Sequence, residues 1–112
     1  MQLHFRNQYG PRVWICISFY DPVRCATAGQ WGTRGYWAID SGQSVWVLDT
    51  NHPRAYFFAE AADGAFWAGE WGIFAPNAPF DSCLWNQRIG DRHLGMRPVD
   101  IPPNGLIMNL IP

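Results

Sequence analysis

Apolar and polar residues alternate along much of the chain with a period of two, which is typical of β-strands. The pattern is clearest over residues 12–20. Four apolar side chains share one face of this segment: Val13, Ile15, Ile17 and Phe19. The opposite face mixes rings with a thiol and a hydroxyl: Trp14, Cys16, Ser18 and Tyr20. Because side chains alternate across a strand, we expect the first face to pack on the core.

The same pattern predicts about nine short strands, separated by glycine, proline, asparagine and aspartate. They are expected at residues 3–6, 12–20, 34–39, 44–48, 55–61, 65–74, 82–86, 96–101 and 106–111. Asp63-Gly64 predicts a hairpin between the fifth and sixth of these strands. The last two are expected to pair with each other, and Pro98 places the earlier one at a sheet edge. Residues 21–33 and 87–95 are predicted to be loops.

Turns recur every eight to twelve positions, and no segment has a convincing helical period. This spacing favours an all-β fold, an antiparallel β-sandwich or small barrel, formed by one domain over residues 1–112. We expect antiparallel pairing throughout, because no helix is available to return a parallel strand.

Aromatic residues add a surplus of rings to this picture. Phe, Tyr and Trp make up 16% of the 112 residues, including seven Trp. One small core cannot bury all these rings, so some must form a surface, a groove or an interface. We expect Trp14, Tyr20, Tyr36 and Tyr56 on the sheet face opposite the core, with Trp31 in the long loop over one end. The alternative is that the chain covers this face with a second small core.

Charge and motifs exclude several classes of function. The net charge is −1, and no basic patch predicts nucleic-acid binding. The longest apolar stretch, residues 13–20, is too short to span a membrane. No phosphate-binding loop, nucleophile elbow or calcium-loop pattern occurs, and the cysteines and histidines lack zinc-site spacing. We therefore expect no cofactor, no metal and no catalytic residue.

Three cysteines leave an odd thiol and one candidate pair. The sequence favours free thiols, with a Cys25–Cys83 bridge as the alternative. Cys83 with His93, or Cys25 with His52, would be the only thiol–imidazole dyads to consider. Glu60 and Glu70 lie on the two arms of the Asp-Gly hairpin and could approach each other like a glycosidase pair. The favoured interpretation is that each carboxylate pairs with an arginine or faces solvent.

Several short motifs occur in order between residues 5 and 75. They are Phe5-Arg6-Asn7, Gly35-Tyr36-Trp37-Ala38-Ile39, Ser41-Gly42, Tyr56-Phe57-Phe58-Ala59-Glu60, Asp63-Gly64 and Trp67-Ala68-Gly69. In this the chain resembles the bacterial family of domains of unknown function DUF1036. The resemblance implies a small β-rich domain, often exported, with no established activity. The chain departs from the family pattern at Ser44 and Ala75, where many members carry cysteine.

These observations favour a non-enzymatic binding module that presents an aromatic sheet face to a carbohydrate, a small apolar ligand or a protein partner. The first alternative is a structural protein that buries this face in a homo-oligomer. The second is a small hydrolase with an unrecognised site. The first residues lack the apolar run of a signal peptide. We expect a cytoplasmic protein if Met1 is the true start, and an exported one if a leader was removed.

Overall fold

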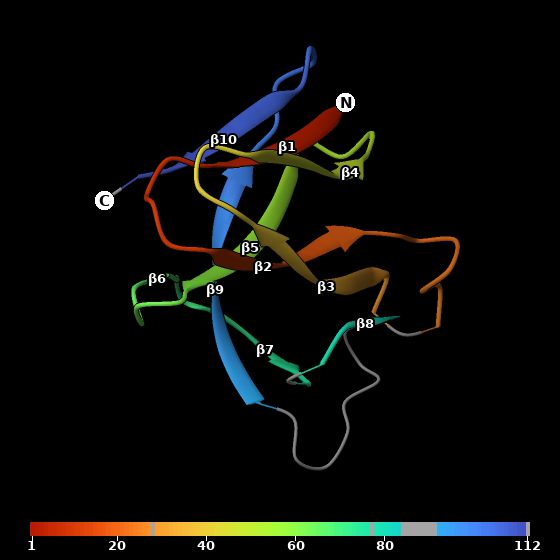
Figure 1. Cartoon of the computed structure of the whole chain (residues 1–112). Helices are drawn as coiled ribbons and strands as arrows, with labels where there is room; N and C mark the ends of the chain where they lie inside the picture. Colours follow the sequence, from red (N-terminus) through yellow and green to blue (C-terminus); the bar gives the residue numbers. More distant parts are fainter. Residues whose placement is uncertain (28, 77, 84–91, 112) are drawn as a thin grey trace.

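The computed structural model describes residues 1–27, 29–76, 78–83 and 92–111. These residues form ten β-strands and no helix (Figure 1). The strands are β1 (Gln2–Asn7), β2 (Val13–Tyr20), β3 (Trp31–Ile39), β4 (Ser44–Asp49), β5 (Arg54–Ala61), β6 (Phe66–Trp67), β7 (Trp71–Ala75), β8 (Phe80–Cys83), β9 (Arg92–Asp100) and β10 (Leu106–Leu110). The all-β fold predicted from the alternation is confirmed.

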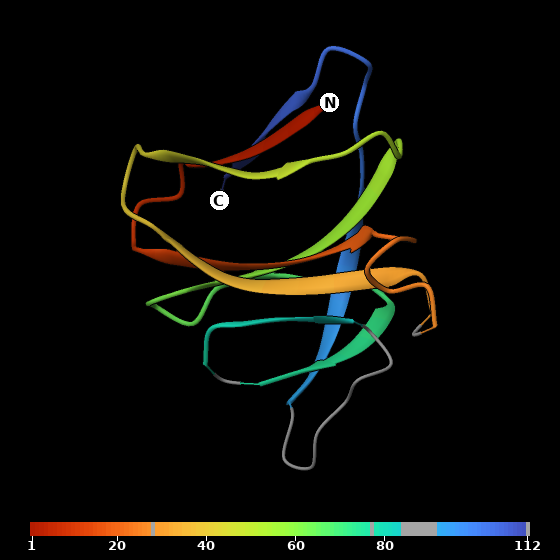
Figure 2. The ribbon, with the colours of Figure 1, turned by 90° about the vertical axis from the view of Figure 1, so that its right-hand side faces the viewer.

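The strands are arranged in two sheets that face each other. The larger sheet has the order β7-β9-β5-β2-β3-β8, with the short β6 added to β5. The smaller sheet has the order β10-β1-β4 and lies over one face of β2 and β5 (Figure 2). At its other end the larger sheet curls, so that β7 and β8 lie beneath the opposite face of β2 and β3 (Figure 2).

The main core fills the space between the two sheets. The four residues expected on the inner face of β2 all lie in it, and each is at most 5% exposed. They pack with buried residues of the smaller sheet, among them Leu3 and Phe5. The predicted register of β2 is therefore confirmed.

A second, smaller core covers the middle of the opposite face. It contains Cys16 from β2, Phe58 from β5, and Ile73, Ala75, Leu94 and Met96 from the β7–β9 pair. Ser18, which is fully buried, donates to the Met96 thioether at 3.1 Å. The chain thus covers the centre of the face that carries the surplus rings.

The last strand does not pair as predicted. β10 runs parallel to β1, with Leu3 opposite Leu106, instead of antiparallel to β9. Gly105 explains the turn, because its φ is +88° and an added Cβ would lie 2.8 Å from the Gln2 carbonyl oxygen. This close approach places the chain beside β1, and the intervening domain supplies the crossover that a parallel pair needs.

The predicted strand over residues 65–74 is divided in two. β6 pairs with β5 across the Asp-Gly turn, but β7 pairs with β9. The change of partner occurs at Gly69, whose N–H donates to the Gly95 carbonyl at 3.2 Å. A Cβ at Gly69 would lie 2.5 Å from the Met96 carbonyl oxygen, so only glycine allows the two backbones to cross there.

Strand β9 is longer than predicted and is not an edge over its whole length. Residues 92–95, expected in a loop, pair with β7, while Pro98 lies opposite Tyr56 of β5. Since β7 pairs only with residues 92–96, the missing N–H of Pro98 leaves no ladder bond unmade. The rest of the loop predicted at 87–95 lies outside the described residues, as do positions 84–86 of the strand predicted at 82–86.

Strand β3 begins three residues earlier than predicted and includes Trp31, which faces Tyr20 across the β2–β3 ladder. Trp31 was expected in the long loop. The β2–β3 pairing instead continues to the end of β2, where the ring of Trp31 packs against the cross-strand ring of Tyr20.

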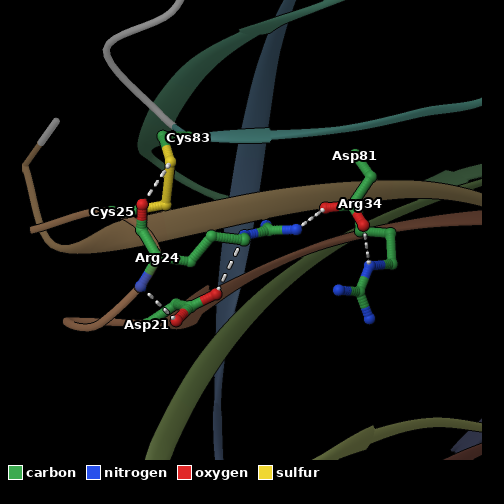
Figure 3. Close-up of polar contacts among 6 residues, drawn as sticks. All are labelled: Asp21, Arg24, Cys25, Arg34, Asp81 and Cys83. Carbon is green, nitrogen blue, oxygen red and sulfur yellow. Dashed lines mark hydrogen bonds and ion pairs between the residues drawn. A yellow bond between two sulfur atoms is a disulfide. The ribbon is translucent and has the colours of Figure 1, made fainter.

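A disulfide joins Cys25 to Cys83, so the preference for free thiols is wrong. The turn that carries Cys25 lies beside the end of β8, and ion pairs continue the connection (Figure 3). Arg24 Nη1 lies 2.7 Å from one oxygen of Asp81, and Arg34 Nε lies 3.1 Å from the other. Arg24 also pairs with Asp21. The disulfide and these ion pairs attach β8 and the 21–30 turn to β3.

Candidate functional site

The predicted site residues gather at the two ends of the face opposite the main core. Trp14 and Tyr20 stand at opposite ends of β2, roughly 20 Å apart for six residues of strand. Tyr36 lies with Trp14, whereas Trp31 and Tyr56 lie with Tyr20. The second core separates the two groups.

At the Trp14 end the surface is hollowed. An open cavity of about 360 Å³ is lined by Trp14, Tyr36, Ala38, Glu60, Pro79 and Arg92. Ala38 and Glu60 are the direct neighbours of Trp14 on the two adjoining strands, so three strands of one sheet form the base. Trp14 is 37% exposed, and among the described residues no other ring stacks on it. Part of its indole is therefore open to solvent.

A charged pair lies beside these rings. Arg92 Nη1 donates to Glu60 Oε2 at 3.1 Å, and the guanidinium carbon of Arg92 stands 5.7 Å from the centre of the Phe58 ring. Burial lowers the pKa of Arg92, but hydrogen bonding to Tyr36 and Glu60 raises it more, so it stays above its usual value. The pair therefore carries one positive and one negative charge and contributes no net charge to the cavity.

Tyr36 is held in place from two sides. Its hydroxyl donates to the Pro76 carbonyl at 2.7 Å, and its ring meets the edge of Phe80 at 5.6 Å between centroids. Burial raises the pKa of this phenol, although Arg92 opposes the shift, so Tyr36 is neutral at physiological pH. The wall of the cavity is therefore a fixed, uncharged ring.

The Tyr20 end has a different character, because its rings pack on each other. Five rings take part: Tyr20, Trp31, His52, Tyr56 and Trp71. Tyr56 stacks on Trp71 with centroids 4.0 Å apart, and Trp31 meets four of its neighbours edge-on or tilted. Ring faces satisfied in this way hold the sheet end together and are less available for a ligand.

The structure also bears on the catalytic alternatives. The disulfide joins Cys25 to Cys83, the one cysteine of each proposed dyad. Neither cysteine can therefore supply a thiolate nucleophile to His52 or His93. Glu60 pairs with Arg92, in agreement with the interpretation that each glutamate pairs with an arginine or faces solvent. Among the described residues, Glu60 is also the only carboxylate that lines the Trp14 cavity. Within the described residues, no three His, Cys, Asp or Glu side chains are grouped to hold a metal ion.

Sequence reasoning missed several residues of both groups. Arg92 lay in a predicted loop, so nothing placed it opposite Glu60. Trp71 was assigned to a hairpin arm, and only the partner change at Gly69 brings it onto Tyr56. His52 was considered only as a dyad partner of Cys25, and nothing in the sequence placed it among these rings.

Of the two groups, the Trp14 cavity is the better candidate site, since it combines an open ring face with polar groups at its base. In the described part of the chain, no helix is long and apolar enough to cross a membrane. Comparison of the sequence with protein-family models and curated proteins, and of the fold with solved structures, finds no match.

Proposed function

We propose that this protein is a non-enzymatic binding module and that the Trp14 cavity binds a carbohydrate. The observation that carries the proposal is an exposed indole set beside a paired carboxylate and guanidinium. Sugar rings present an apolar face of C–H groups with hydroxyls around the rim. An indole with polar groups at its edge matches both features.

The polar base favours a neutral sugar over a charged one. The Glu60 carboxylate accepts hydrogen bonds and the Arg92 guanidinium donates them, and they lie 3.1 Å apart. Two neighbouring hydroxyls of a sugar can donate to one and accept from the other. An anionic ligand would gain from Arg92 but be repelled by Glu60, so the pair gives it little net attraction.

Affinity electrophoresis in gels containing soluble polysaccharides tests the proposal. Neutral glucans, mannans and xylans are compared with the acidic polygalacturonate. We expect at least one neutral polymer to retard the protein and Trp14→Ala to abolish the retardation. A stacked ring contributes about 0.5–1.5 kcal/mol beyond its area burial, so loss of this term alone weakens binding about twofold to tenfold, and loss of the buried area weakens it further.

Trp46→Ala is the matched control. Trp46 is also an exposed tryptophan, at 55%, but it lies on β4 in the smaller sheet, away from the cavity. It should leave the retardation unchanged. The proposal would be contradicted if no neutral polymer retarded the wild-type protein. It would also be contradicted if Trp14→Ala and Trp46→Ala lost the retardation equally.

Two further proposals concern kinship and compartment. We propose that the chain is related to DUF1036, on the motifs named above; they fall on β1, β3, β5 and β6 and on adjacent turns, and the resemblance adds no activity. The Cys25–Cys83 disulfide supports an oxidising compartment, where such bonds persist and where polysaccharides are accessible. Mass spectrometry of protein alkylated at the moment of lysis of the native cells tests the second point.

A further inference from the structure

β10 forms one edge of the smaller sheet and, among the described residues, has β1 as its one partner strand. β10 lies at the outside of the smaller sheet, beyond β1 (Figure 1). The carbonyl of Leu110 accepts from Gln8 on the β1 side. In a parallel ladder alternate residues bond the same neighbour, so Ile107 and Asn109 direct their N–H and C=O groups away from β1.

The composition of this edge is unusual for one that faces water. Residues 106–111 read LIMNLI and contain no charge, proline or glycine, and Ile107 and Ile111 are about half exposed. Natural edge strands are commonly blocked by charges or irregularities. Edge strand β8 has them, because Asp81 is held between two arginines and Cys83 is bridged. Edge strand β4 ends on Asp49, which pairs with the N-terminus.

We propose that a second copy of this chain pairs with β10 in an antiparallel ladder, so that the two smaller sheets form one continuous six-stranded sheet. A twofold axis relates the two copies in this pairing. Both copies therefore use the same edge, and the association stops at a dimer. An uncharged strand can do this because no like charges meet across the axis. With Met108 at the axis, Ile107 of each copy lies opposite Asn109 of the other, on the exposed face.

This inference is independent of the sugar site, which lies on a different sheet. Analytical ultracentrifugation across a range of protein concentrations tests it. We expect the mass to rise with concentration from 12.8 kDa toward twice that value. Ile107→Lys/Asn109→Lys should keep the protein monomeric at every concentration, because lysines would then face lysines across the axis.

Two comparisons separate pairing from a loss of folding. Trp46→Lys places a lysine on the exposed face of the other edge strand of this sheet and should leave the dimer intact. A mixture of the double lysine variant with Ile107→Glu/Asn109→Glu should restore a dimer of one copy of each, since opposite charges then meet. A wild-type chain that stays monomeric at high concentration, or a mixture that does not associate, would overturn the proposal. Association of wild type that the lysine variant does not abolish would also overturn it.

Discussion

Cys25 and Cys83, 58 residues apart in the chain, are joined by a disulfide that attaches the 21–30 turn to the end of β8. β8 is four residues long and has β3 as its one partner strand among the described residues. Phe80, at the start of β8, supports the ring of Tyr36 and so the wall of the cavity. The bridge therefore acts on stability and on the shape of the candidate site.

Removal of the bridge should cost considerable stability. A loop of 58 residues corresponds to about 4 kcal/mol of entropy restored to the unfolded chain. We expect Cys25→Ser/Cys83→Ser to lower the free energy of unfolding in urea by about 2–4 kcal/mol, the range of typical disulfides. Reductant should lower the stability of the wild type by a similar amount and leave the variant unchanged. A variant as stable as the oxidised wild type would refute this.

Neighbouring residues on β2 should respond very differently to truncation. Ile15 is fully buried in the main core, so Ile15→Ala should cost about 2–5 kcal/mol in the free energy of unfolding. Trp14, one position earlier, faces the open cavity, and Trp14→Ala should cost about 1 kcal/mol or less. Thermal and urea unfolding of both variants measure the difference. A large loss in Trp14→Ala would show that its face is core and would remove it from the site.

Local patterns predicted the strands well, and they failed where two distant segments decide the structure. The alternation over β2 gave the right faces because each side chain obeys the pleat of its own strand. The partner of β7 depends on Gly69 meeting Met96, and the partner of β10 depends on Gly105 meeting Gln2. Nothing near either glycine identifies the segment that it approaches.

The candidate site shows the same division. Trp14 and Tyr36 were expected on one face because both lie on strands with clear alternation. Arg92 joins them only because β9 extends beyond its predicted start to reach Glu60. A surplus of rings was a sound reason to expect a ring surface, but it did not show that three of the five predicted rings pack chiefly on other rings.

Cys16 should be inert in the folded protein. Burial raises its pKa to about 12, although Thr33 and Arg92 oppose the shift, and its side chain is fully buried. The thiolate is the reactive form, so alkylation at pH 8 should proceed only through unfolding. We expect no reactive thiol in the folded, oxidised protein and one after unfolding without reductant. Rapid labelling of the folded chain would contradict the assignment of Cys16 to the second core, and three thiols on unfolding would contradict the bridge.

Asn7 provides the sharpest test of the packing between the sheets, because its buried amide uses all of its hydrogen-bonding groups. It is fully buried, and its Nδ2 donates to the carbonyls of Pro11 and Ile39 at 2.8 and 3.0 Å. Its Oδ1 accepts from the N–H groups of Tyr9 and Gly10. Asn7→Asp keeps the shape and the acceptor but turns a carboxyl oxygen toward two carbonyl oxygens.

The burial and the facing carbonyls should raise the pKa of Asp at position 7 in the folded state above the unfolded value of about 3.9. The folded state then binds more protons, so the variant loses stability as the pH rises above the unfolded value. We expect its deficit relative to wild type to grow between pH 4 and pH 7 and to reach about 3 kcal/mol or more, since two buried carbonyls also lose their donors. Urea unfolding at several pH values measures this. Asn104→Asp, in the exposed 102–105 turn, is the control and should show no such growth. Parallel pH profiles for the two variants would show that Asn7 does not join β1 to β3 in the way the hydrogen bonds indicate.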